Sequence, residues 1–199
     1  GKHVLCEKPL ANTVAEAEAM TAAAAEAAKS GVRAMVGFTY RRTPAVALAQ
    51  RLVAEGRIGT IRLVRAQYLQ DWLTDENAPL NWRLDKDRAG SGSLGDIGAH
   101  IIDMAQFVTG SQIASVNGML ETFVKTRPIG GEHATLGGSS SSDAERGPVT
   151  VDDAAVFTAR FVDGAIGVFE ATRFATGRKN ALRLEVNGTK GSLAFDFEY

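Results

Sequence analysis

Two short apolar runs on either side of an alanine-rich run constrain the fold most strongly. Residues 3–7 and 33–38 each predict a strand, and residues 12–31 between them predict a helix. Thr13 and Glu16 have the spacing of a capping box at the start of that helix. A strand, a helix and a strand of these lengths predict one parallel β-α-β unit. Because parallel strands need neighbours and cover on both faces, the unit must belong to a larger sheet.

The rest of the chain has a different pattern. Residues 43–59 predict a second amphipathic helix with Pro44 in its first position, and residues 96–109 predict a short helix. Residues 74–88 and the glycine- and serine-rich residues 129–148 predict loops. Alternating or β-rich runs predict the strands of a mostly antiparallel sheet, at residues 60–72, 113–124, 151–162, 165–175, 181–188 and 191–197.

The charge balance and the thiol content argue against several classes of protein. The 199 residues include 22 basic and 23 acidic side chains, for a net charge of −1. Without a basic cluster a nucleic-acid partner is not expected, and without a long apolar run neither is a membrane span. The single cysteine, Cys6, excludes an internal disulfide and fits a reducing compartment such as the cytoplasm. Both ends fall in strand-like runs, so we expect the chain to be part of a longer protein.

Residues 90–95 contain a pattern that raises the question of nucleotide binding. Their three glycines spell G-x-G-x-x-G, the phosphate-binding fingerprint of dinucleotide-binding folds. That fingerprint requires a buried strand before it and a carboxylate about twenty residues after it. Residues 81–89 are too charged for a central parallel strand, and no carboxylate lies near position 110. The glycines are therefore expected to permit a sharp turn and the close approach of a ligand, without binding a nucleotide themselves.

Asp96 and His100 are the first candidates for chemistry. In a helix that begins near Asp96 the two side chains share a face, and Asp103 lies close to that face. A carboxylate holds an imidazole ring and raises its pKa, which suits a general acid or base. Two other interpretations stay open. Asp96 can cap the helix while His100 is an ordinary packed residue, and a metal site is possible, although three histidines and one cysteine supply few ligands.

Lys8 is the second candidate. It follows the first predicted strand, at the carboxyl end where open α/β sheets bind their ligands. Pro9 makes the Lys8–Pro9 bond a candidate cis peptide. The simpler interpretation is a surface lysine in a strand-to-helix turn. Cys6 is a poor nucleophile candidate, because Glu7 beside it would raise the pKa of the thiol.

Two more groups of residues could line the same site. Tyr40 and the two arginines after it end the second strand at the same predicted sheet edge as Lys8. Trp82 and Arg83 combine an aromatic face with a guanidinium, which suits a nicotinamide or a sugar ring. Ordinary loop packing with solvated arginines explains both groups equally well.

Four stretches, taken in order, resemble the Gfo/Idh/MocA oxidoreductase family of glucose–fructose oxidoreductase and the inositol dehydrogenases. GKHVLCEKPLA resembles the KHVxxEKP strand of the family, and VGFTYRRTP resembles its GFxxRxxP strand end. NWRLDKDRAGSGSLGDIGAHIID resembles the WR…AGGGxLxDxGxHxID signature, and GTKGSLAFD resembles the GxxGxL hairpin. Two departures are visible. Ser91 and Ser93 are expected to crowd the glycine turn slightly, and the dinucleotide fingerprint of the family would have to precede Gly1.

The resemblance implies roles for individual residues. Lys8 matches a lysine that contacts the reacting oxygen of the substrate near the nicotinamide. His100 matches the acid/base histidine, and Asp96 matches an aspartate that supports it and binds substrate. Glu7 and Pro9 belong to the motif that borders the cofactor.

The resemblance also implies a cofactor and a fold. The cofactor would be NAD or NADP, with Trp82 and Arg83 matching a pair that lines the nicotinamide side in some members. Tyr40 is expected to bind substrate. Residues 1–40 would be the last β-α-β unit of a truncated Rossmann domain. Residues 41–199 would be an α+β domain for substrate binding and oligomerisation, with a large, mostly antiparallel open sheet that is incomplete at the C-terminus.

The implied activity is hydride transfer between a nicotinamide cofactor and a hydroxyl of a sugar or cyclic polyol. Two alternatives on the same fold stay open: a non-catalytic sensor of sugars or nucleotides, and an NAD-dependent glycosidase. Strand alternation leaves one sheet face free of helices, and family members often pair through that face. We therefore expect a homodimer or homotetramer.

Overall fold

A computed structural model describes residues 1–129 and 144–198. Contacts along the backbone divide the chain into two compact units, Gly1–Thr39 and Tyr40–Tyr199. Most of the loop predicted at residues 129–148 lies outside the described residues. Within the described ranges, no helix has both the length and the apolar character that crossing a membrane requires.

The first unit is a single parallel β-α-β unit, as predicted. β1 (Val4–Cys6) pairs in parallel with β2 (Ala34–Val36), and α1 (Val14–Ala28) connects the two strands. Thr13 caps α1 and forms the predicted capping box with Glu16. The Lys8–Pro9 peptide bond is cis, which confirms that prediction as well.

Much of the apolar surface of this unit is exposed. No residue of α1 is buried, and Leu5, Val14 and Met35 are 68%, 75% and 56% exposed. Two parallel strands and one helix have too few neighbours to cover both faces of a sheet. The unit therefore presents surfaces of the kind on which further strands and helices pack.

The described part of the second unit contains a six-stranded sheet in the order β10-β9-β3-β8-β7-β4. Neighbouring strands run antiparallel except β3 and β8, which are parallel, so the prediction of a mostly antiparallel sheet is confirmed. In chain order the strands are β3 (Ile61–Leu69), β4 (Ile113–Glu121), β7 (Ala154–Phe161), β8 (Ile166–Thr172), β9 (Ala181–Gly188) and β10 (Ser192–Asp196).

Two very short strands were not predicted. β5 (Thr126–Pro128) pairs antiparallel with β6 (Arg146–Pro148), and β6 falls in a segment for which the sequence predicted a loop. A strand of three residues is too short to show an alternating pattern. Such strands form because the tertiary structure brings partners together.

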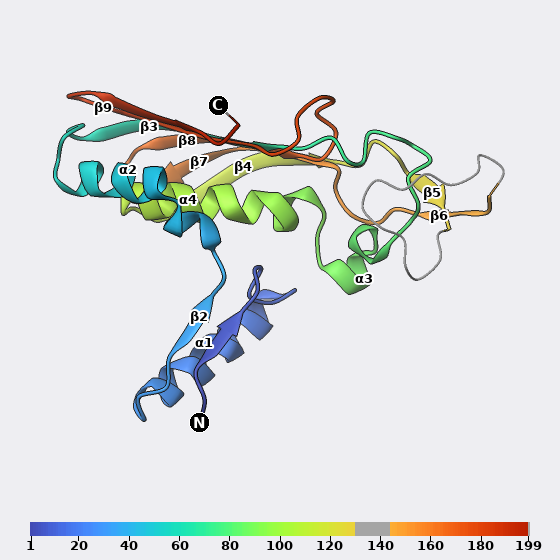
Figure 1. The fold of residues 1–199 in the computed structure, drawn as a ribbon, viewed down its shortest axis with the longest axis horizontal. Coiled ribbons are helices and arrows are strands. Elements are labelled where there is room, and N and C mark those ends of the chain that lie inside the picture. The colour runs from blue at the N-terminus through green and yellow to red at the C-terminus, as the bar shows by residue number, and fades with distance from the viewer. Residues whose placement is uncertain (130–143, 199) are drawn as a thin grey trace. The chain divides into compact units, whose positions relative to one another are not determined.

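Two helices cover one face of the large sheet (Figure 1). They are α2 (Pro44–Ala54) and α4 (Ala99–Thr109), which pack against each other. α4 also packs against β3 and β9. The residues of α4 that face the core follow the helical spacing i, i+3, i+4, i+7: Ile101, Met104, Ala105 and Val108. The described residues place no helix on the opposite face of the sheet.

Short helical turns connect the sheet to α4. They are η2 (Trp82–Leu84), α3 (Lys86–Ala89) and η3 (Leu94–Gly98), whereas η1 (Thr39–Arg42) lies between β2 and α2. η2 and α3 correct the prediction of a loop over residues 74–88. The helix predicted from Asp96 begins two residues earlier, at Leu94, as a π-helical turn that continues into α4. Asp96 therefore lies inside a helical segment and does not cap it.

The glycine turn at residues 90–95 is organised by the side chain of Asp152. Its carboxylate accepts hydrogen bonds from the amides of Gly92 and Leu94, at 2.8 and 2.7 Å, and from the Ser93 hydroxyl, at 2.8 Å. A Cβ atom on Gly92 would lie 1.9 Å from the Asp152 carbonyl oxygen. The close approach expected of a ligand is thus made by Asp152. Ser93 was expected to crowd the turn, but it is fully buried and serves as a hydrogen-bond donor.

We expect Gly92→Ala to lower the free energy of unfolding by about 2–3 kcal/mol, because the added methyl group overlaps the backbone of Asp152. Urea unfolding of the full-length protein measures this change. Gly191→Ala is the control, since a Cβ atom there has no neighbour within 4 Å. Equal unfolding midpoints for the two variants would contradict the tight contact.

Candidate functional site

His100 lies on α4 beside two tyrosine rings. Its ring centroid is 5.0 Å from that of Tyr40, in an edge-on arrangement, and 6.0 Å from that of Tyr68. The two tyrosine hydroxyl oxygens are 2.7 Å apart. The structure thus brings together two residues that the sequence predicted for the site, His100 and Tyr40. It adds Tyr68, which was not predicted.

A chain of hydrogen bonds continues from Tyr68. Its hydroxyl donates to Oδ1 of Asn180 at 2.6 Å, and Gln70 Nε2 donates to the same oxygen at 3.2 Å. Gln70 Oε1 in turn accepts from the indole nitrogen of Trp72 at 2.9 Å. Because Tyr68 gives its one hydroxyl proton to Asn180, Tyr40 must be the donor in the tyrosine pair. The Tyr40 oxygen therefore keeps lone pairs that can accept a hydrogen bond from a bound molecule.

The pKa of Tyr68 is raised well above its ordinary value. Burial is the largest cause, followed by the hydrogen bond with Tyr40, and the negative charge of Asp96 acts in the same direction. Tyr68 consequently stays protonated at any pH at which the folded protein would work. This phenol can bind and orient, but it cannot act as a general base.

Asp96 and Asp103 each pair with an arginine. Asp96 Oδ2 lies 3.6 Å from Nη1 of Arg173. Asp103 is held by Arg41, whose Nε donates to it at 2.8 Å and whose Nη2 makes a second short contact. The hydrogen bond to Asp103 raises the pKa of Arg41. Asp103 thus pairs with a guanidinium, a contact that the sequence did not predict. The contact of Asp96 with His100 stays a prediction.

Trp82 and Arg83 form a stacked pair on η2. The guanidinium carbon of Arg83 lies 4.5 Å from the centroid of the Trp82 ring, and the side chain of Asn81 caps the turn by accepting from the Arg83 amide. Trp82 is 45% exposed. One indole face is covered by the neighbouring arginine. The role of the pair beside a nicotinamide stays a prediction.

Glu7, Lys8 and Pro9 belong to the first unit, where they follow β1 and precede α1. Lys8 therefore lies at the carboxyl end of a parallel strand, as predicted. Its approach to His100, which belongs to the second unit, stays a prediction. Among the described residues, no group of three His, Cys, Asp or Glu side chains could hold a metal ion.

Family models match both parts of the chain. The model described as "GFO/IDH/MocA C-terminal domain" matches residues 46–194, and the model described as "Oxidoreductase family, NAD-binding Rossmann fold" matches residues 1–38. The chain belongs to the Gfo/Idh/MocA oxidoreductase family. The resemblance inferred from the four sequence stretches is therefore confirmed.

Similar proteins include enzymes that act on sugars. Levoglucosan dehydrogenase from Pseudarthrobacter phenanthrenivorans is 48% identical over 100% of this chain and 50% of its own length. The crystal structure of an oxidoreductase domain protein from Kribbella flavida is 73% identical, with a TM-score of 0.92, over 100% of this chain and 50% of that one. A structure of levoglucosan dehydrogenase in complex with NADH and levoglucosan is 46% identical, with a TM-score of 0.85. The match covers 98% of this chain and 48% of that one. The chain spans about half the length of the curated relatives it matches.

Sequence reasoning missed several polar residues around His100. Tyr68 had a detectable signal, because it lies on the apolar side of an alternating strand and a buried tyrosine hydroxyl needs a partner. Asn180 and Arg173 had none. Asn180 contacts Tyr68 and Arg173 lies near Asp96. Both pairs are far apart in the sequence, so only the tertiary structure brings the partners together.

We expect the stability of the protein to fall above about pH 10 partly because of Tyr68. The unfolded chain loses this proton near the ordinary value of 10.0, whereas the folded protein keeps it. Above that pH the unfolded state therefore binds fewer protons, and the free energy of unfolding decreases as the pH rises. In Tyr68→Phe this contribution is absent, so urea unfolding at a series of alkaline pH values should show a shallower loss. Equal slopes for the two proteins would contradict the raised pKa.

Proposed function

We propose that this chain forms part of an NAD- or NADP-dependent dehydrogenase that oxidises a hydroxyl of a sugar or cyclic polyol. The placement of His100 against hydrogen-bonded tyrosines, in a domain of this family, is the observation that carries the proposal. The dehydrogenase relative crystallised with NADH and levoglucosan supports it. Cys6 is the one thiol in these 199 residues, and we propose the reducing cytoplasm as the location of the enzyme.

His100 is the proposed proton acceptor. Oxidation of a secondary hydroxyl requires removal of the hydroxyl proton as hydride leaves the carbon, and a neutral imidazole can take that proton. Tyr68 cannot do so, because its pKa is raised. Its bond to Tyr40 instead fixes the Tyr40 oxygen as an acceptor for another substrate hydroxyl. We assign Asp96 to substrate binding and to support of His100.

Lys8 is the proposed electrostatic partner in the reaction. Its ammonium group would stabilise negative charge that develops on the reacting oxygen, an effect that is large where water is excluded. Substrate would thus be bound by Lys8, Tyr40, Asp96 and His100. This assignment requires the carboxyl end of β1 and the start of α4 to share one site in the assembled enzyme.

The residues present fit only one end of the cofactor. Glu7, Lys8 and Pro9, together with Trp82 and Arg83, would hold the nicotinamide end. When bound, the cofactor supplies the hydride acceptor. The glycine turn at 90–95 does not fit the pyrophosphate, because the Asp152 carboxylate already occupies its amides. We propose that the pyrophosphate is bound by the remainder of a Rossmann domain that covers the exposed faces of β1, β2 and α1.

We expect His100→Ala and Lys8→Ala each to lower turnover at least about a hundredfold in the full-length protein. The measurement is reduction of NAD or NADP with a panel of sugars and polyols. His3→Ala and Lys29→Ala are matched controls, since both side chains are in exposed positions of the first unit. Wild-type turnover in either site variant would contradict the assigned roles.

Two further measurements, of cofactor binding and of glycoside cleavage, test the two alternative functions. Cofactor binding without oxidation of any sugar or polyol would favour a sensing protein. Cleavage of a nitrophenyl glycoside that depends on NAD would favour a glycosidase. Either result would replace the dehydrogenase proposal.

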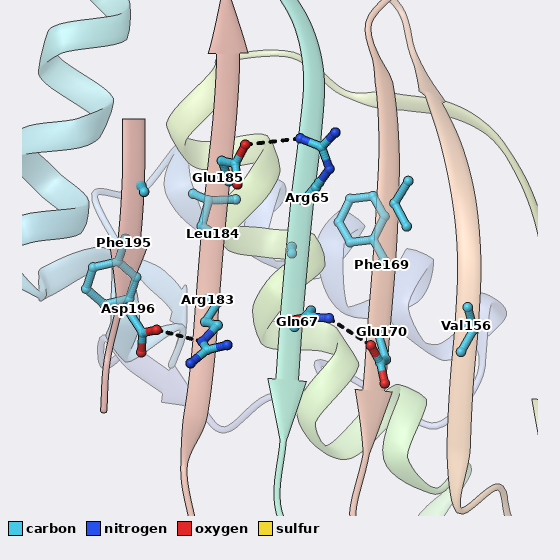
Figure 2. A pocket seen from close by; sticks show the side chains of 13 residues that line it. Arg65, Gln67, Val156, Phe169, Glu170, Arg183, Leu184, Glu185, Phe195 and Asp196 are labelled. Atoms are coloured by element: carbon cyan, nitrogen blue, oxygen red, sulfur yellow. Dashed lines mark hydrogen bonds and ion pairs between the residues drawn. The ribbon is translucent and has the colours of Figure 1, made fainter. Parts of the chain in front are cut away.

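We further propose that the uncovered sheet face binds a second copy of this chain. Figure 2 shows side chains of both charges arranged across neighbouring strands of that face. Arg65 pairs with Glu185 at 3.0 Å, and Arg183 pairs with Asp196 at 2.6 Å. Val168, which is 46% exposed, lies directly opposite Arg65 in the sheet. A surface that contains both charges beside apolar groups can be complementary to itself, as a two-fold dimer requires.

We expect Val168→Asp to convert the oligomer into monomers, because it replaces an apolar contact in the interface with a charge that must be removed from water. Light scattering gives the mass of each variant. Val162→Asp is the control, since Val162 is 67% exposed but follows the end of β7. A monomeric wild-type protein, or an unchanged mass for Val168→Asp, would contradict this interface.

A further inference from the structure

Arg173 is a fully buried guanidinium next to the candidate site. It follows β8, is 0% exposed, and donates from Nη2 to the carbonyl oxygen of Asp152 at 3.1 Å. Its guanidinium carbon lies 5.2 Å from the centroid of the Trp72 ring. Its Nη1 lies 3.6 Å from the carboxylate of Asp96. A charge removed from water in this way is tolerated only where opposite charges compensate it.

The neighbouring carboxylates differ in what they do for Arg173. Asp152 uses its two carboxylate oxygens on the glycine turn, and Asp153 uses Oδ2 on the amides of Phe123 and Val124. Among the residues that the structure describes, Asp96 is the carboxylate within ion-pair distance of Arg173. Asp96 also keeps 32% of its side chain exposed, so it can meet a ligand while paired.

A second buried arginine shows what a purely structural role looks like. Arg127 is also 0% exposed, but it donates to the carbonyl oxygens of Leu73, Asp75 and Ala78. Those hydrogen bonds fix the backbone of the loop at residues 73–78. By contrast, Nη1 of Arg173 has no hydrogen-bond partner among the described residues and lies 3.6 Å from Oδ2 of Asp96. A separation of 3.6 Å is an ion pair that can tighten into a hydrogen bond when a substrate is bound.

We propose that Arg173 is a positioning residue that acts through Asp96. Its buried guanidinium fixes the direction of the Asp96 carboxylate, so that this carboxylate is already oriented to accept a hydrogen bond from a substrate hydroxyl. The inference rests on the proposed function, in which Asp96 binds substrate. It assigns Arg173, which lies 77 positions after Asp96 in the sequence, to the same site without direct contact with substrate.

Steady-state kinetics of the full-length protein test this role. We expect Arg173→Met to lower kcat/KM about tenfold or more, because a misdirected carboxylate weakens both substrate binding and alignment. Arg173→Lys should recover part of the loss, since it restores the charge without the planar fork. Arg127→Met is the matched control. It removes an equally buried guanidinium and should cost stability, measured by urea unfolding, while kcat/KM of the folded enzyme stays within about twofold.

A double-variant cycle separates positioning from general damage. If Arg173 acts through Asp96, then Asp96→Asn combined with Arg173→Met should have the kcat/KM of Asp96→Asn alone, within about twofold. If the double variant instead loses kcat/KM by the product of the two single-variant losses, the inference is overturned. If Arg173→Met does not fold, the same cycle with Arg173→Lys gives the answer.

Binding measured by calorimetry supplies a readout apart from turnover. With levoglucosan as the probe, Arg173→Met should raise Kd about as much as Asp96→Asn does, and Arg127→Met should leave it unchanged. An unchanged Kd for Arg173→Met would count against the inference. A wild-type protein that oxidises no sugar would overturn the proposed function, whereas an active wild type with multiplying losses would overturn only the role of Arg173.

Discussion

The hydrogen bonds accepted by the Asp152 carboxylate are the interaction on which the candidate site in the second unit depends. It joins the turn at residues 92–94 to the chain just before β7 and so sets where η3 and α4 begin. The Asp152 carboxylate accepts hydrogen bonds from the amides of Gly92 and Leu94. The absence of a side chain at Gly92 permits close packing against the backbone of Asp152. The positions of Asp96 and His100 follow from this anchor, because both lie within the two turns that come directly after it.

The candidate site combines hydrogen-bonding side chains that can orient a bound molecule with His100, the proposed proton acceptor. Tyr40, Tyr68 and Asn180 form a hydrogen-bonded series in which each donor has a defined partner. Burial keeps Tyr68 protonated, and His100 is the base in the function proposed above. The pairing of Asp96 with a buried arginine adds a carboxylate of fixed direction. These features suit recognition of several hydroxyl groups on one small molecule, as a sugar dehydrogenase requires.

Local signals in the sequence were sufficient for most of the fold. The capping box of α1, the parallel pair of β1 and β2, and the six strands of the large sheet were all predicted, because each depends on residues close together in the chain. Errors arose where partners are distant. β6 was assigned to a loop, and the start of α4 was misplaced, since a π-helical turn has no distinct pattern in a single sequence. The close contact of Asp152 with Gly92 was not predicted, because the two residues are 60 positions apart in the sequence.

The sequence by itself determined the family, the β-α-β unit and the candidate residues Lys8, Asp96 and His100, because short motifs and periodicities report local geometry directly. Only the tertiary structure decided which charges are buried and what each one contacts. Arg173 and Arg127 look like ordinary arginines in the sequence, yet both are fully buried, one beside Asp96 and the other on backbone carbonyls. The physical reason is that burial and charge pairing depend on how strands distant in the chain are ordered in the sheet, and one-dimensional patterns do not encode that order.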